Sequence, residues 1–226
     1  MKTKIVVLLL AGVSLFGVDA KWERFKRDVV SKQKLVHGWC NPEKAKKMME
    51  LIYEVKPDVC VEVGVFGGAS IHPTAQALKF NNKGYVVAID PWDNVDCLEG
   101  YDPDDPNFKW WSEVDMKAIF AHFKAMLKRN RLEKFCRIMK TTSAKAVEEF
   151  EDGSIDILHI DGNHTEDSAY FDAISWFPKV KQGGYIWFDD VNWTSTGKAI
   201  RFMKENCKLI KSRSVGNECY LFKKGS

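Results

Sequence analysis

The sequence lacks the local patterns that define several common functional classes. No two of its six cysteines have the C-x-x-C spacing of a structural zinc site. The formal net charge is only +3, without the basic stripe expected of a nucleic-acid-binding surface. No apolar run reaches the about 20 residues that a membrane-spanning helix needs, so no stable membrane span is expected. What is present is a globular composition, 45% hydrophobic and 29% charged, in 226 residues.

The N-terminus has the pattern of a secretory signal. Lys2 and Lys4 precede an apolar run from Ile5 to Val18, and Ala20 follows where a signal peptidase cuts after a small residue. We therefore predict a signal peptide at residues 1–20 and a single domain at 21–226. An uncleaved membrane anchor and a cytosolic extension are the alternatives.

The remainder alternates short, valine-rich apolar runs with amphipathic stretches. Such alternation is typical of a parallel sheet covered by helices on both faces. We predict an α/β fold with a Rossmann-like, doubly wound, mostly parallel sheet and a C-terminal antiparallel hairpin. The predicted parallel strands are 58–65, 85–89, 135–139, 155–160 and 185–188, and the hairpin strands are 209–214 and 219–222. The predicted helices are 21–34, 42–55, 69–80, 113–130, 143–150, 165–177 and 196–206.

Residues 91–112 fit neither class. The segment contains three tryptophans, which argue against disorder, and five aspartates. Long connections beside strand ends usually carry function. We interpret it as a lid or substrate-recognition loop, with a structural insertion as the alternative.

Ligands of doubly wound sheets bind at the carboxyl ends of the strands. The first predicted strand is followed by Gly64, Gly67 and Gly68, which allow a tight turn and close approach to a ligand. The second glycine of the G-x-G-x-x-G dinucleotide motif is missing, and so is the Gly-Lys-Ser/Thr of a P-loop. Asp90 ends the second strand, where an acid can bind both hydroxyls of a ribose, and Trp92 could stack on an adenine ring.

Together these motifs resemble a known family. Glu62-x-Gly64-x-x-x-Gly68, with Asp90 after the next strand, resembles the first two motifs of class I S-adenosylmethionine-dependent methyltransferases. The stretches 160–164 and 183–190, with Asp172 between them, resemble the macrocin and cephalosporin-hydroxylase-like subgroup. They are also similar to the metal-dependent catechol-type O-methyltransferases. The resemblance covers residues 58–222.

The resemblance implies roles for individual residues. Asp161, Asp189 and Asp190 match the ligands of a divalent metal, and converging carboxylates would repel one another without a cation between them. Hard oxygen ligands suit Mg²⁺ or a similar ion. His164 and Asp161 are the candidate catalytic residues, with His164 as general base or substrate-orienting group. The predicted binding residues for S-adenosylmethionine are Glu62, Gly64, Phe66, Gly68, Ser70, Asp90, Trp92, Ser143 and Asp161.

The sequence thus predicts an S-adenosylmethionine-dependent methyltransferase, in which a divalent metal assists transfer to a hydroxyl group of a small acceptor. Two alternatives stay open. One is a nucleotide-dependent oxidoreductase on the same sheet. The other is a non-catalytic exported binding protein, which the leader favours because the cofactor is made and used in the cytosol. That conflict leaves the cellular location open, and the sequence does not indicate an oligomeric state.

Overall fold

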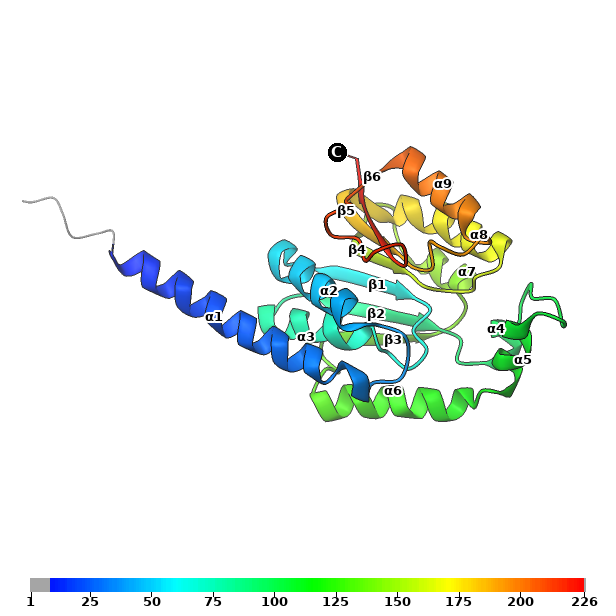
Figure 1. The fold of residues 1–226 in the computed structure, drawn as a ribbon, viewed down its shortest axis with the longest axis horizontal. Helices are drawn as coiled ribbons and strands as arrows, with labels where there is room; N and C mark the ends of the chain where they lie inside the picture. The colour runs from blue at the N-terminus through cyan, green and yellow to red at the C-terminus, as the bar shows by residue number, and fades with distance from the viewer. Residues whose placement is uncertain (1–8, 226) are drawn as a thin grey trace, which may run out of the picture.

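The computed structural model describes residues 9–225, so the first eight residues of the predicted signal peptide lie outside the described part. The chain folds into one seven-stranded sheet with helices on both faces (Figure 1). The strand order is β3-β2-β1-β4-β5-β7-β6, in which β7 runs antiparallel to both of its neighbours. The predicted fold class is confirmed.

Helices cover both faces of the five parallel strands, so the side chains on both faces are buried. Side chains of successive residues point to opposite faces of the sheet, so Cys60 packs in one core cluster and Val61 in the other. Apolar residues therefore follow one another along these strands instead of alternating with polar ones. The parallel strands are β1 (Val59–Val63), β2 (Tyr85–Asp90), β3 (Cys136–Lys140), β4 (Ile155–Ile160) and β5 (Val180–Phe188), followed by β6 (Cys207–Leu209) and β7 (Tyr220–Lys224).

Each face of the sheet has its own set of helices. One face packs against α1 (Leu9–Ser31), α2 (Pro42–Val55), α3 (Ile71–Asn81) and α6 (Met116–Asn130). The other packs against α7 (Ser143–Ala146), α8 (Glu166–Trp176) and α9 (Gly197–Asn206). Short 3₁₀ helices span Gln33–Leu35, Val147–Glu149 and Phe177–Lys179.

Helix α1 continues through the predicted cleavage point at Ala20, and its second half belongs to the core. Trp22 is buried and stacks on Tyr53 of α2 with ring centroids 4.3 Å apart. The Lys26 ammonium lies 2.6 Å from a carboxylate oxygen of Glu50, which is also in α2. Figure 1 shows the first half of α1 extending away from the domain. Within residues 9–225, no helix has both the length and the apolar character needed to cross a membrane.

Two predicted segments differ in detail from the structure. The first hairpin strand is Cys207–Leu209 rather than 209–214, because α9 leads straight into it and the polar residues 211–213 form turns. Residues 91–112 are not a bare loop, since they contain α4 (Asn94–Cys97) and most of α5 (Pro106–Glu113). Asn94 ties these helices together by donating hydrogen bonds to the carbonyls of Trp111 and Val114.

Candidate active site

A cavity of about 480 Å³ opens at the carboxyl ends of β1, β2 and β4. Its volume lies within the range of small-molecule sites. Residues 91–112 cover one side of it, contributing Asp96, Cys97, Glu99, Tyr101 and Trp111. Asn163 fastens this segment to the end of β4 through a 2.8 Å hydrogen bond to the carbonyl of Glu99.

The glycine turn after β1 forms the floor of the cavity. Gly64 has φ +83°, and a Cβ there would lie 1.9 Å from the carbonyl oxygen of Asp161. Only glycine therefore allows β1 and β4 to approach so closely at their ends. Gly68 (φ +85°) instead faces Phe123, whose ring would be 2.5 Å from an added Cβ. Gly64 borders the cavity, whereas Gly68 permits close packing beneath it.

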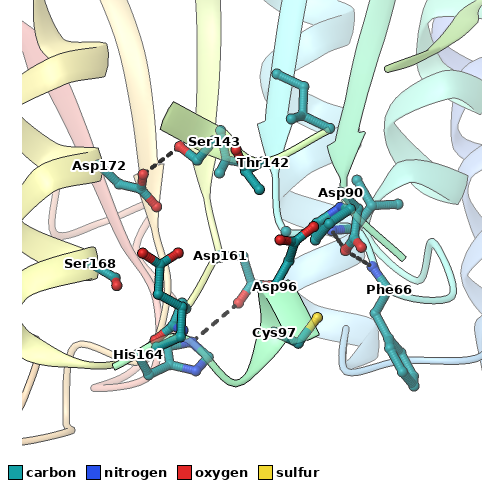
Figure 2. Close-up of a pocket in the computed structure, with 18 of the residues that line it drawn as sticks. Phe66, Asp90, Asp96, Cys97, Thr142, Ser143, Asp161, His164, Ser168 and Asp172 are labelled. Carbon is teal, nitrogen blue, oxygen red and sulfur yellow. Dashed lines mark hydrogen bonds and ion pairs between the residues drawn. The ribbon is translucent and has the colours of Figure 1, made fainter. Parts of the chain in front are cut away.

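Asp90 shapes the same turn from the end of β2. Its carboxylate accepts 2.9 Å hydrogen bonds from the backbone N–H groups of Val65 and Phe66 (Figure 2). It also accepts one of 2.7 Å from the backbone N–H of Trp92. Burial raises the pKa of Asp90, and these three donors oppose that shift. Asp90 also borders the cavity, where the sequence predicted a ribose-binding acid.

Besides Gly68, two further predicted cofactor residues lie behind the cavity rather than along it. Trp92 is buried between Phe120 and Phe123, and its indole N–H donates to the Phe66 carbonyl at 2.8 Å. Its predicted stacking on adenine is therefore wrong, because the ring is already enclosed by the core. Glu62 is also buried and accepts a hydrogen bond from Ser70, which does border the cavity. Glu62 thus lies behind Ser70 and does not border the cavity itself.

Ser143 borders the cavity at the start of α7. Its hydroxyl donates to Asp172 of α8 (Figure 2). It also accepts a 2.8 Å hydrogen bond from the indole of Trp176. Burial raises the pKa of Asp172 to about 7, although the Ser143 hydroxyl opposes that shift. This network joins α7 to α8 at the edge of the cavity.

Acidic and basic side chains alternate at the ends of β4 and β5. Asp161 borders the cavity, and His164 lies with its Nε2 3.8 Å from Asp161 Oδ1 and 2.8 Å from Asp190 Oδ2. The carboxylate of Asp189 instead points into the protein, where it contacts Lys44 and lies 2.7 Å from His159 Nε2. Asp161, His164 and Asp190 form one group of closely spaced potential ligand atoms, and His159, Asp189 and Cys219 form another.

The three predicted metal ligands therefore do not form one group. Asp189 belongs with the buried bases, because Lys44 and His159 take up its inner carboxylate oxygen. Asp161 lies between the two groups, 3.6 Å from Lys44. Sequence reasoning missed Lys44. The available signal was its position four residues before Met48, on the apolar stripe of α2, where a charged residue is unexpected.

The protonation states assign different roles to Asp161 and His164. Burial lowers the pKa of His164, but the hydrogen bonds and negative charges of Asp161 and Asp190 outweigh burial and raise the pKa to about 10. A histidine with that pKa holds its proton at neutral pH, which favours the substrate-orienting role predicted for His164 over that of a general base. Burial and the nearby Asp189 raise the pKa of Asp161 to about 7. Asp161 is therefore suited to accept a proton near neutral pH.

Aromatic side chains form the outer wall of the cavity. Trp39 lies against Phe66 and Trp110, with ring centroids 5.1 and 5.4 Å away, and Phe66 meets Trp111 edge-on at 6.0 Å. Trp39 is 67% exposed although it is apolar. Such exposed aromatic faces beside a cavity are typical of a binding surface for a planar or apolar group.

Comparisons with known proteins agree with this architecture. A family model described as a methyltransferase domain matches residues 61–191, more than half of the chain. The chain belongs to this methyltransferase domain family. The match begins within β1 and ends just after β5, so it includes Asp90, Asp161, Asp189 and Asp190 but not Lys44.

Solved methyltransferase structures share the fold at low sequence identity. The O-methyltransferase NovP has a TM-score of 0.67 and 15% identity, with 92% of this chain and 100% of that chain covered. The SAH-bound methyltransferase PaMTH1 of Podospora anserina has a TM-score of 0.60 and 11% identity, with both chains fully covered. The O-methyltransferase of Bacillus cereus in complex with SAH has a TM-score of 0.57 and 14% identity, covering 92% and 91%.

A curated relative is also similar in sequence. The uncharacterized protein y4gI of Sinorhizobium fredii is 25% identical over 143 residues, which is 63% of this chain. The aligned part spans only 14% of that relative's length.

Proposed function

We propose that this chain transfers the methyl group of S-adenosylmethionine to a hydroxyl group of a small acceptor. The observation that carries the proposal is that one cavity joins two sets of residues. Gly64, Ser70 and Asp90 border it on the side of β1 and β2, and Asp161 and His164 border it on the side of β4. A donor and an acceptor can thus be held next to each other, which is the main requirement for this reaction.

The cofactor side provides groups for each part of S-adenosylmethionine. Asp90 is placed for the ribose hydroxyls, and Ser143 borders the cavity where the adenine would lie. The amino acid end would meet Ser70 at the start of α3, where backbone N–H groups attract a carboxylate. Ser70 does not cap α3 with its own side chain, because its hydroxyl donates to Glu62 instead.

The chemistry requires only one proton transfer. The ionised Asp161 accepts the proton of the acceptor hydroxyl, and the oxygen then bonds to the methyl carbon. The carbon–sulfur bond breaks, and its electron pair stays on sulfur, giving neutral S-adenosylhomocysteine. His164 is a positioning residue that holds Asp161 and Asp190 by its charge. The predicted Mg²⁺ ligands Asp161, Asp189 and Asp190 do not lie in one group, because the Asp189 carboxylate faces Lys44 and His159, so no step is assigned to a metal.

The experiment is methyl transfer from radiolabelled S-adenosylmethionine to a panel of catechols, phenols and hydroxylated sugars. We expect a labelled product with the wild-type chain and at least about a 100-fold slower reaction with Asp161→Asn, as for removal of a general base. Binding of S-adenosylhomocysteine by Asp161→Asn should remain, since Asn keeps the side-chain volume.

The outcomes separate the alternatives. Cofactor binding without turnover of any acceptor would favour a non-catalytic binding protein. Binding of NAD instead of S-adenosylmethionine would favour an oxidoreductase, an interpretation that gains no support from the family match.

A further inference from the structure

A buried lysine lies next to the acidic side chains at the strand ends, where a positive charge offsets their mutual repulsion. Lys44 is the third residue of α2, and its backbone N–H is held by the side chain of Asn41, the N-cap, at 2.9 Å. From this fixed position its side chain reaches across to the sheet. Its ammonium contacts Asp189 Oδ2 and lies 3.6 Å from Asp161 Oδ2.

The inner half of the cluster is balanced without any ion. Glu62 and Asp189 flank His159, with Glu62 Oε2 3.0 Å from Nδ1 and Asp189 Oδ2 2.7 Å from Nε2. The two carboxylates therefore face two basic side chains, His159 and Lys44. Buried charges are stable only when they are paired in this way.

The outer half has one basic side chain of its own, His164, and shares Lys44 with the inner half. His164 lies between Asp161 and Asp190, and Lys44 contacts Asp161 from the inner side. Each carboxylate of the cluster thus lies next to at least one basic side chain. These three bases, set against four carboxylates, reduce the mutual repulsion that supported the metal site implied by the resemblance.

Lys44 and a divalent ion compete for the same space. Mg²⁺ binds its carboxylate ligands at about 2.0–2.1 Å. An ion shared by Asp161 and Asp189 would have to lie between their Oδ2 atoms, and this is where the Lys44 ammonium lies. The ion could enter only if that side chain left a site in which it is buried.

We propose that the Lys44 ammonium takes the place of the divalent cation in this site, so that the chain requires no metal. Lys44 is a positioning residue, because it contacts Asp161 and Asp189 and does not border the cavity. Lys44 occupies this position whatever acceptor the chain methylates.

Mn²⁺ titration followed by electron paramagnetic resonance tests the proposal without cofactor or acceptor. We expect no stoichiometric Mn²⁺ binding by the full wild-type chain. Lys44→Ala removes the built-in cation and opens space, so it should gain a site at least about tenfold tighter than any site in wild type. Lys46→Ala is the matched control, because Lys46 lies on the same helix but is exposed. It should behave like wild type.

Two results would overturn the proposal. One is a wild-type chain that binds one Mn²⁺ and loses it in Asp190→Asn. The other is a folded Lys44→Ala that binds Mn²⁺ no better than Lys46→Ala. Circular dichroism establishes the folding of each variant, and the wild-type titration decides the matter by itself if Lys44→Ala is unfolded. Since no methyl transfer is measured, this result is independent of whether the proposed function holds.

Discussion

At the scale of single residues, Gly64 shows how the backbone determines the site. The positive φ and the missing Cβ together allow β1 to lie against the carbonyl of Asp161. We predict that Gly64→Ala lowers the free energy of unfolding by at least about 2 kcal/mol, because an L side chain is strained at this φ and also collides with backbone. Urea denaturation measures the change.

Gly153 provides the control for this substitution. It also has a positive φ, +66°, but an added Cβ would meet nothing within 4 Å. Gly153→Ala should therefore cost only about 1 kcal/mol, the backbone part of the effect. Equal losses in the two variants would show that the contact with Asp161 is unimportant.

Asp172 gives a prediction about pH. Its pKa is about 7 in the folded chain against 3.8 for an ordinary aspartate, so the folded state holds a proton that the unfolded state has lost. Stability falls with rising pH wherever the folded state binds more protons. We predict that the wild-type chain loses stability between pH 4 and 7, by up to about 4 kcal/mol from this group.

Asp172→Asn removes the titrating group and keeps a partner for the Ser143 hydroxyl. Its stability should change less than that of wild type across the same pH range, as measured from urea midpoints at each pH. Parallel pH curves for the two proteins would contradict the assigned protonation.

The sequence predicts residue roles best where a backbone reason exists. Gly64 and Asp90 could be assigned because a tight turn and a strand end restrict what they can do. Trp92 could not, since a tryptophan next to a strand end suits a ligand or a core equally well, and only packing against Phe120 and Phe123 decides. Lys44 could not be assigned either, because its partners Asp161 and Asp189 are more than 100 residues away in sequence.

At the scale of elements, periodicity and caps predicted most of the structure. Asn41 and Pro42 placed the start of α2 correctly, because an N-cap and a first-turn proline are local signals. The first hairpin strand was misplaced because nothing in residues 207–214 distinguishes strand from turn until β7 is present to pair with it. Pairing partners, rather than local sequence, determine a short edge strand.

The segment 91–112 has a charge that restricts the acceptor. Asp96 and Glu99 of this segment and Asp167 of α8 border the cavity, and His164 is the one basic side chain among the described residues that line it. Repulsion should therefore exclude anionic acceptors. Among catechols of similar size, we predict that kcat/KM for 3,4-dihydroxybenzoate is at least about tenfold lower than for dopamine, which corresponds to about 1.4 kcal/mol.

Replacing Asp96 and Glu99 tests whether their negative charge causes this preference. The double variant Asp96→Asn, Glu99→Gln should reduce the ratio of kcat/KM for dopamine to kcat/KM for 3,4-dihydroxybenzoate, as measured by competition kinetics. Asp152→Asn, an exposed acid in the connection between β3 and β4, serves as the control. An unchanged ratio in the double variant would show that these acids do not select the acceptor.

At the scale of the whole molecule, α1 has two different halves. Trp22 packs against Tyr53 and Phe80, with ring centroids 4.3 and 5.0 Å away. The domain thus needs the helix from about residue 21 onward. A chain that starts after Ala20, as signal cleavage would produce, should melt at the same temperature as the full chain. Deletion of residues 1–31 should lower the melting temperature, which calorimetry would detect.

Trp22→Ala tests whether α1 stabilises the domain through the packing of this one side chain. Loss of a buried tryptophan typically costs about 3–5 kcal/mol, so this variant should approach the stability of the longer deletion. A full-stability Trp22→Ala would mean that α1 is not part of the domain core.

Calorimetry with S-adenosylhomocysteine tests the central claim most directly, namely that the cavity at the ends of β1, β2 and β4 binds the adenosyl cofactor. We predict one site per wild-type chain and at least about tenfold weaker binding by Asp90→Asn, which loses the charge proposed to face the ribose. Asp93→Asn should bind like wild type, since Asn also caps α4. Absence of binding by wild type, or equal binding by both variants, would contradict the account.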